Sequence, residues 1–378
     1  MTTRRNRRSG VEDLWWMTVR NEDGTTEKVK TKLYGKGKRW RARYVDDTGE
    51  EHTQRFAKKT DAKEWLDGQT ATLVAGTHVA PRDAKMTVGQ WCDEWLKGYA
   101  VHRDSTVRQA KTHIAQIKSQ FGDIPLSAVR PSHVKEWVAT LKGRGHEPSY
   151  VHALHSRLSQ ICGDAVLDGV LARNPCSRRT SPPAGKQKVY CCTTEQVWAI
   201  YDAMPEHMRA AVLLGAFAGL RIAEISGLRV ADVDFIRGIV HPKQQWPAKP
   251  LKTPGSEAPV PIPNDLALML SAAVQARPGE RVVTDDAGKP VPPLQLNRAL
   301  IAVRATIPGL PEKFGFQDLR HYLASLLIAN AANIKVVQAR MRHADAKTTL
   351  DTYGHLWPET DESTRLVIAT VIKERMAS

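Results

Sequence analysis

A proline-rich and polar segment near the middle of the chain divides it into parts that must fold around separate cores. This segment runs from Asn174 to Lys186 and includes two consecutive prolines. Such a composition is typical of a linker, since proline breaks helices and removes backbone donors. A second break, from Ala75 to Asp83, contains a glycine and a proline and follows a helical pattern. The two breaks predict three domains: residues 1–82, 83–178 and 179–378.

The first domain is predicted to be a small three-stranded sheet plus a helix. Residues 39–45 alternate strictly, with Arg39, Arg41 and Arg43 on one face and aromatic or small residues on the other. A turn, a return strand over 51–56 and a helix from Thr60 complete the pattern. Two interpretations of the arginine face remain open: a solvated face of an ordinary sheet, or a sheet laid into a DNA groove. The first eight residues carry four arginines and are expected to form a basic arm.

The second and third domains are predicted to be helical. Thr87 and Thr193 each begin a capping box, and Ser105, Ser132 and Ser149 are predicted to open further helices. The pattern of the middle domain fits either a binding module or a structural spacer. A short hairpin region is expected within 239–262. The fold class predicted for the whole chain is mainly α with small β elements (α+β).

The composition indicates which classes of partner and chemistry to expect. Lysine plus arginine number 55 against 40 for aspartate plus glutamate, which gives a formal charge of +15. This excess predicts a polyanionic partner, with nucleic acid first. No run of 18 apolar residues is present, so no membrane partner is expected. The five cysteines form no CxxC pair, which favours neither a zinc ribbon nor a disulfide framework and fits a reducing cytoplasm. The absence of a P-loop motif predicts chemistry without ATP, and neither a cofactor nor a metal is expected.

Four clusters in the last domain carry the candidate chemistry. A glycine precedes Arg221 in Gly219-Leu-Arg-Ile-Ala-Glu224, so Arg221 is expected at a helix N-terminus, where backbone N–H groups favour an anion. The others are Gln317-Asp-Leu-Arg-His-Tyr-Leu-Ala-Ser325, Met341-Arg-His-Ala-Asp-Ala-Lys-Thr-Thr349 and Leu350-Asp-Thr-Tyr-Gly-His-Leu356. Taken singly, each cluster is more often structural, with Glu224 a salt-bridge partner and His321 and His355 packing or supporting residues.

Together, the clusters resemble the tyrosine recombinase or phage integrase family, which also includes the bacterial Xer recombinases. The G-L-R-x-x-E, D-L-R-H-x-x-A-S and H-x-x-x-x-T-T-x-x-x-Y boxes occur in order at family-like spacing. The likeness runs from about residue 35 to 365. It includes Phe121-Gly-Asp-Ile-Pro-Leu126, which is similar to the family's helical core-binding (SAM-like) domain. The first domain is similar to its N-terminal arm-binding domain, and the last to its catalytic domain.

The resemblance implies the residues of the active site. Arg221 and Arg320 match the arginines that hold the phosphate, a task suited to planar guanidinium groups. His343 matches a phosphate hydrogen-bond donor, and Tyr353 matches the nucleophile that forms a 3′-phosphotyrosyl link. Lys252 matches the hairpin lysine that protonates the leaving 5′-oxygen; Lys243 and Lys249 are its competitors.

Two positions depart from the family pattern. The family usually has histidine three residues before the second arginine, where this chain has Gln317. Glutamine cannot carry charge or shuttle a proton, so it is expected to orient the phosphate or the tyrosine. Arg342 stands where the family commonly has glycine.

The predicted function is therefore a site-specific DNA recombinase of the phage integrase type, which integrates and excises a mobile genome. Alternatives are a catalytically weak or inactive DNA-binding regulator and a conjugative-transposon integrase; a metal-dependent DDE transposase is disfavoured. Implied partners are arm-type and core-type attachment sites, a homo-tetramer on DNA, a host DNA-bending protein and an excisionase. An apolar stripe in Thr364–Ile372 is expected to dock on a neighbouring subunit.

Overall fold

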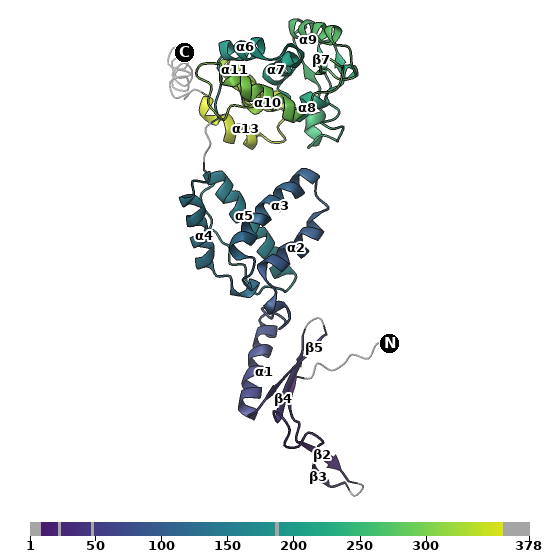
Figure 1. The fold of residues 1–378 in the computed structure, drawn as a ribbon, viewed down its shortest axis with the longest axis vertical. Coiled ribbons are helices and arrows are strands. Elements are labelled where there is room, and N and C mark those ends of the chain that lie inside the picture. Colours follow the sequence, from purple (N-terminus) through teal and green to yellow (C-terminus); the bar gives the residue numbers. More distant parts are fainter. Residues whose placement is uncertain (1–8, 22–23, 47–48, 186–188, 358–378) are drawn as a thin grey trace, which may run out of the picture. The chain divides into compact units, whose positions relative to one another are not determined.

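The computed structural model describes residues 9–21, 24–46, 49–185 and 189–357 (Figure 1). The chain divides into two compact units, Met1–Lys186 and Gln187–Ser378. Two predictions, the basic arm of the first eight residues and the docking helix Thr364–Ile372, lie outside the described residues. Within the described part of the chain, no helix is both long and apolar enough to cross a bilayer.

The first unit begins with the predicted three-stranded antiparallel sheet and helix. The sheet order is β1-β4-β5, formed by Gly10–Asp13, Trp40–Val45 and Glu51–Phe56. Helix α1 (Lys59–Val74) packs on it, with Ala62 and Leu66 buried against Ala42 and Tyr44. A separate hairpin pairs β2 (Trp16–Arg20) with β3 (Thr26–Lys30). Thr60 does not cap α1, because the helix begins one residue earlier at Lys59 and has no side-chain cap.

The arginine face of this sheet is paired with acidic residues of β1. Arg39 contacts Asp13 at 2.8 Å and Arg41 contacts Glu12 at 2.9 Å. Arg43 lies 3.8 Å from the same Glu12. These pairs are partly exposed, so each contributes little to stability, and a phosphate can compete with the carboxylates. The alternation within 39–45 gave no sign of these partners, since Glu12 and Arg41 are 29 residues apart in sequence.

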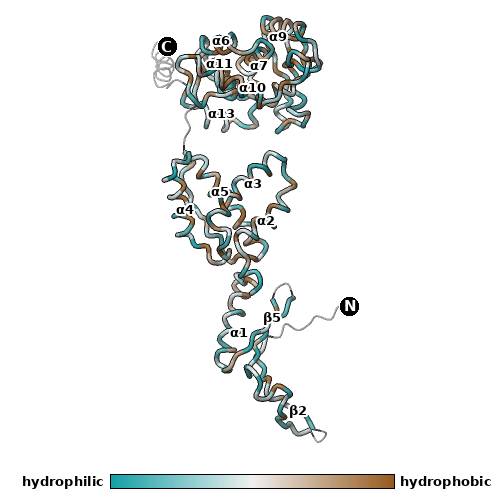
Figure 2. Tube along the Cα trace, in the orientation of Figure 1, coloured by the Kyte–Doolittle hydropathy of each residue, from teal (hydrophilic) through white to brown (hydrophobic). Residues whose placement is uncertain are grey.

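The rest of the first unit is a helical bundle with its own core (Figure 2). Its helices are α2 (Val88–Tyr99), α3 (Asp104–Phe121), α4 (Pro131–Gly143) and α5 (Pro148–Leu167). The predicted capping box at Thr87 is present, with Gln90 as its partner. The predicted serine caps are wrong: each of the three helices begins one residue before its serine. In two of them a proline occupies the first turn, where its missing N–H costs nothing.

The second unit is mainly helical, with one large hydrophobic core, a smaller cluster that includes Tyr353, and a small three-stranded sheet. The sheet has the order β6-β7-β8, from Val233–Asp234, Ile239–Val240 and Val260–Pro261. The helices are α6 (Thr194–Ala203), α7 (Arg209–Ala216), α8 (Ile222–Gly227), α9 (Asn264–Ala276), α10 (Pro293–Arg304), α11 (Phe316–Ala329), α12 (Ile334–Arg340) and α13 (Ala346–Tyr353). The fold class is thus mainly α with small β elements, as predicted.

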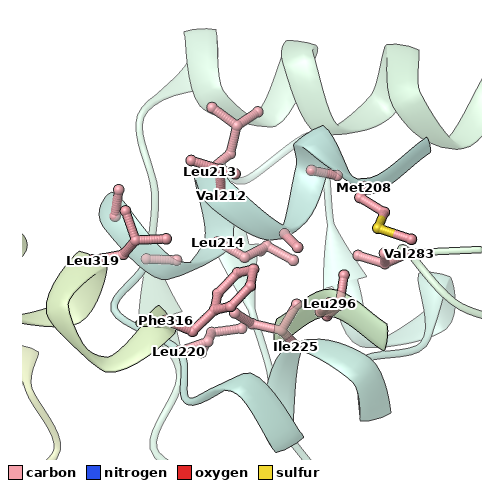
Figure 3. Close-up of a cluster of buried hydrophobic side chains, with 14 of the residues drawn as sticks. Met208, Val212, Leu213, Leu214, Leu220, Ile225, Val283, Leu296, Phe316 and Leu319 are labelled. Carbon is pink, nitrogen blue, oxygen red and sulfur yellow. The ribbon is translucent and has the colours of Figure 1, made fainter. Parts of the chain in front are cut away.

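Core packing in this unit holds the segments that carry the candidate chemistry. Figure 3 shows Leu214 of α7, Leu220, Ile225 of α8 and Phe316 of α11 in one hydrophobic cluster. Leu220 and Ile225 flank Arg221 in sequence and are fully buried, which fixes the backbone on both sides of that arginine. Burying these side chains stabilises the arrangement by roughly 1.5–3 kcal/mol each.

Candidate active site

Arg221 sits at the helix start that the sequence predicts. Helix α7 ends at Ala216, and Gly219 adopts a φ of +64°, where a Cβ would come within 2.8 Å of Leu323. Both facts require glycine at this position. Arg221 is the N-cap of α8: its backbone N–H donates to Glu224 Oε2 at 3.1 Å, and its Nη1 donates to Oε1 at 2.8 Å. The half-buried guanidinium is therefore held in place before any ligand arrives.

Arg320 ties two other segments to this helix start. It lies on α11 with only 1% of its surface exposed. Its Nη1 donates to the carbonyl of Gly219, and its Nη2 donates to the carbonyl of Met341. Burial, together with the nearby Arg221 and Arg342, lowers the pKa of Arg320 to about 9. The group still carries its charge at neutral pH, in a place where an anion would stabilise it.

Arg342 and Glu224 form a buried ion pair that the sequence did not reveal. Arg342 Nη2 lies 2.6 Å from Glu224 Oε2, and both side chains are almost fully buried. Burial alone would raise the pKa of Glu224, but the charge of Arg342 and hydrogen bonds from Arg221 and Arg342 outweigh it and lower that pKa. Glu224 is thus a salt-bridge partner, as expected, but it serves two arginines. In the sequence, Arg342 stood out only as a departure from the family pattern.

His343 lies just before helix α13, and Tyr353 is the last residue of that helix. His343 Nδ1 is 2.8 Å from Thr349 Oγ1, and its ring is nearly parallel to that of Tyr353 at a centroid distance of 6.3 Å. Burial, then the charges of Arg320 and Arg221, lower the pKa of His343 to about 4. The imidazole is therefore neutral at pH 7. Asp345 caps α13 through the Thr348 N–H and so fixes the short segment between the histidine and the helix.

Tyr353 is held by His321, a residue for which the sequence predicted only packing or support. The tyrosine is 1% exposed, and its hydroxyl lies 2.6 Å from His321 Nδ1. Burial raises the pKa of Tyr353, and the charge of Arg320 opposes this rise. Burial and Arg320 lower the pKa of His321 to about 4. The sequence could not predict this contact, because His321 and Tyr353 are 32 residues apart. The one available sign was that His321 directly follows Arg320.

The three candidate lysines differ in their surroundings. Lys252 is exposed in the segment between β7 and β8. Four residues later, the fully buried Ser256 accepts a hydrogen bond from Arg221 Nη1 at 3.1 Å, which brings this segment to the arginines. Lys243 instead lies 3.8 Å from Asp232. The backbone of Lys249 pairs with Gln245 in a tight turn.

Gln317 lies on the exposed side of the first turn of α11. It lines a cavity of about 560 Å³ together with Lys313 and His321. Residues 317 and 321 are one helical turn apart and so face the same side of α11. The glutamine therefore lies next to the histidine that holds Tyr353.

The structure thus brings Arg221, Arg320, His343 and Tyr353 into one site in the second unit. The predicted N-terminal arginines, Arg39, Arg41 and Arg43, lie in the first unit, on and beside strand β4. The fold and the site together define a class of protein: a mainly helical protein in which a buried tyrosine lies beside a cluster of arginines.

Comparison with known proteins gives that class its family. The phage integrase family model matches residues 191–359, and the model of the phage integrase N-terminal SAM-like domain matches residues 87–142. The two matches together span more than half of the chain. The chain belongs to the phage integrase (tyrosine recombinase) family.

Curated relatives agree with this assignment. The chain is 26% identical over 323 residues to the integrase of Mycobacterium phage L5, covering 79% of this chain and 85% of that protein. It is 24% identical over 335 residues to a putative prophage phiRv2 integrase of Mycobacterium tuberculosis, covering 82% and 88%.

Two solved structures share the fold. The Tn1549 transposon integrase bound to transposon right end DNA matches with a TM-score of 0.66 at 18% identity, covering 78% of this chain and 100% of that one. A lambda integrase dimer bound to a core site matches with a TM-score of 0.62 at 18% identity, covering 84% and 94%.

Proposed function

We propose that this protein is a tyrosine-type site-specific DNA recombinase that cuts and rejoins DNA through a 3′-phosphotyrosyl intermediate. The observation that carries the proposal is the charge balance beside Tyr353. Within the described site, three guanidinium groups, of Arg221, Arg320 and Arg342, gather around one buried carboxylate, that of Glu224. Such a surplus of positive charge favours a bound phosphate.

Arg221 and Arg320 would hold the non-bridging oxygens of the scissile phosphate. Charge builds on these oxygens as the phosphorus becomes five-coordinate, and preorganised cations stabilise it without reorganising. His343 would add a hydrogen bond. If the Thr349 hydroxyl donates to Nδ1, the neutral ring carries its proton on Nε2, where it can donate to the phosphate. In that tautomer, Thr349 would leave Nε2 as the nitrogen of His343 that donates.

His321 would accept the proton of Tyr353. In the unbound protein the nearby charge of Arg320 contributes to the low pKa of His321. A DNA phosphate on the arginines would offset that charge and so raise the pKa of His321, and it would equally weaken the effect by which Arg320 lowers the pKa of Tyr353. The tyrosine oxygen then bonds to phosphorus, and the bond from phosphorus to the 5′-oxygen breaks. The 2.6 Å contact places the acceptor at the hydroxyl, so the proton would pass to His321 as the tyrosine oxygen attacks.

Lys252 would protonate the departing 5′-oxygen. Two observations support this choice: Ser256, four residues after Lys252, is hydrogen-bonded to Arg221, and Lys243 lies 3.8 Å from Asp232. The phosphotyrosyl link retains the energy of the phosphodiester bond. A 5′-hydroxyl from a partner strand can therefore reverse the step, and the reaction needs no ATP.

The domain roles follow from the family. We propose that residues 1–82 bind arm-type sites through Arg39, Arg41 and Arg43, that 83–178 bind the core site, and that 179–378 carry catalysis. A lambda integrase tetramer has been solved on a Holliday junction, with a TM-score of 0.57 to this chain. We propose the same assembly here, acting on attachment sites in a bacterial cytoplasm with a host DNA-bending protein and an excisionase.

The likeness to the Tn1549 integrase also fits an integrase of a conjugative transposon. Both assignments share the same chemistry and differ in the DNA ends on which the enzyme acts. The DNA sequences that become linked to the protein separate them, because phage and transposon ends lie in different genetic surroundings.

Covalent capture tests the proposal. The full chain is incubated with fragments of its own element and of the host chromosome in EDTA and without ATP, then denatured, and protein-linked DNA is recovered and sequenced. We expect adducts at one defined site with the wild type and none with Tyr353→Phe, which should still bind that site. Sequence-specific binding without adducts, where Gln317→His does form them, would favour the inactive regulator.

A further inference from the structure

Arg342 occupies a backbone position that disfavours any side chain. Its φ is +51°, in the left-handed region where glycine is favoured. The family commonly has glycine here, yet this chain has a long side chain that is almost fully buried. An arginine in such a position must make contacts that offset both the backbone strain and the desolvation of its charge.

The contacts of Arg342 join two parts of the site. Nη2 pairs with Glu224 at 2.6 Å, and Nη1 donates to the backbone carbonyl of Ser256 at 2.7 Å. Ser256 is fully buried, and its hydroxyl accepts a hydrogen bond from Arg221 and lies 2.9 Å from Thr253 Oγ1. Ser256 is therefore hydrogen-bonded to two arginines: its hydroxyl to Arg221 and its backbone carbonyl to Arg342.

The hydrogen bonds to Ser256 hold the segment that carries Lys252. The lysine lies four residues before Ser256, in the connection between β7 and β8, and a short 3-10 turn over Pro254–Glu257 links the two. Lys252 is exposed, so its own side chain contributes little to holding the segment in place. The position of its ammonium group thus depends on where the backbone of this segment is anchored.

We propose that Arg342 is a positioning residue that anchors Ser256 and so fixes the Lys252 segment against the phosphate-binding arginines. The proposal rests on the proposed function, in which Lys252 is the general acid. A glycine at this position, as the family commonly has, could not form that anchor. A displacement of about 1 Å in a catalytic group can cost on the order of 100-fold in rate.

The test uses the leaving group to separate the lysine from the rest of the site. Arg342→Gly keeps the left-handed backbone unstrained and removes the anchor. The substrate is a suicide duplex of the captured core site, with either an ordinary 5′-oxygen or a 5′-bridging sulfur, whose thiolate leaves without a general acid. We expect Arg342→Gly to form adducts roughly 10- to 100-fold more slowly with oxygen and within about threefold of wild type with sulfur.

Two further variants make the comparison decisive. Lys252→Ala should show the same rescue by sulfur, with a larger loss on oxygen. Arg304→Ala removes another arginine-to-carbonyl hydrogen bond of this unit, to Phe314, and should leave the two substrates equal. Equal loss of Arg342→Gly on both substrates, or no loss, would overturn the anchoring role. Lack of sulfur rescue in Lys252→Ala alone would overturn the assignment of the acid.

A readout without DNA tests the anchor separately from the proposed function. Amide hydrogen exchange of the whole protein reports on the N–H groups of Ser256 and Ala258, which bond within the turn. We expect faster exchange there in Arg342→Gly and no change in Arg304→Ala. Unchanged exchange in Arg342→Gly would contradict the proposal even if the protein cleaves DNA. A complete lack of wild-type adduct would overturn the function while leaving this measurement to decide whether the anchor exists.

Discussion

At the residue scale, the proposed nucleophile is hard to ionise and the proposed base is hard to protonate. Tyr353 is buried and His321 is half-buried, and their 2.6 Å contact joins two neutral groups in the unbound protein. Charged Arg320 acts to lower the pKa of both, which favours the tyrosinate but disfavours the imidazolium. A phosphate on the arginines would offset both effects, so the proposed proton transfer depends on the 2.6 Å contact and on the tyrosine oxygen bonding to phosphorus as its proton leaves.

Replacing His321 by phenylalanine should slow cleavage without weakening DNA binding. The variant keeps a ring of similar size beside Tyr353 but removes the acceptor of its proton, so we expect adduct formation to slow roughly 100-fold. Single-turnover adduct formation and a binding titration on the same core-site duplex measure the two effects. His355→Phe is the matched control, because His355 follows Tyr353 closely in sequence but is exposed. An unchanged rate in His321→Phe would remove His321 from the mechanism.

The two half-buried histidines of the site, His321 and His343, should also make stability depend on pH. The pKa values of His321 and His343 are about 4 in the folded protein, against an ordinary value of 6.5. Between these values the unfolded chain binds protons that the folded chain does not, so the free energy of unfolding falls as the pH drops from 6.5 towards 4. Above pH 6.5 both histidines are neutral in either state, and their full contribution to stability is present. Urea midpoints at pH 7 and pH 5 measure the loss. It should be smaller in the His321→Asn, His343→Asn double variant; an equal loss would contradict the shifts.

Linear motifs predict the candidate site residues whose type and spacing match the family boxes. Arg221, Arg320, His343 and Tyr353 belong to ordered boxes, so the sequence predicted them together. His321 and Arg342 lie inside the same boxes, but their roles arise from contacts with Tyr353 and Ser256, which are 32 and 86 residues away. No local periodicity encodes such contacts, because they depend on how α11 and the segments between helices pack in the core.

At the element scale, helix starts and strands were predicted correctly where the sequence signal lies within a few neighbouring residues. The capping boxes at Thr87 and Thr193 were predicted correctly, since each is complete within four residues. The serine caps were wrong at Ser132 and Ser149, because a proline at the first helical position outweighed the serine that follows it. The sequence pattern predicted strands β4 and β5 of the three-stranded sheet and the helix that follows. The third strand, β1, with its acidic residues, could be identified only from its pairing with β4 in the structure.

The arginine face of β4 should bind DNA through its charge. Replacing Arg39, Arg41 and Arg43 by alanine should weaken binding to long attachment-site DNA and reduce the slope of log K against log salt by about 0.9 for each phosphate that is no longer neutralised. Cleavage of a minimal core site should persist. Titrations at several salt concentrations measure this. Glu12→Gln is the opposite control: it removes the carboxylate that competes for Arg41 and should strengthen binding. An unchanged slope in the triple variant would contradict the assignment.

At the scale of the whole molecule, composition and domain breaks predicted a basic, helical protein of several parts, and the family match confirmed the class. The division at 82/83 and 178/179 remains a prediction, and so do the separate tasks proposed for the parts. Only one of these parts contains the proposed reacting groups: within the described residues, the clustered arginines, His343 and Tyr353 all belong to the unit 187–378.

Mapping the protein–DNA link tests the central claim most directly. The captured adduct is digested with protease and nuclease, the modified peptide is identified by mass spectrometry, and the released DNA strand is assayed for a free 5′-hydroxyl. We predict a phosphodiester from the Tyr353 oxygen to the 3′-end of the cleaved strand, formed in EDTA and without ATP. A link to a different residue, or a link to the 5′-end, would contradict it.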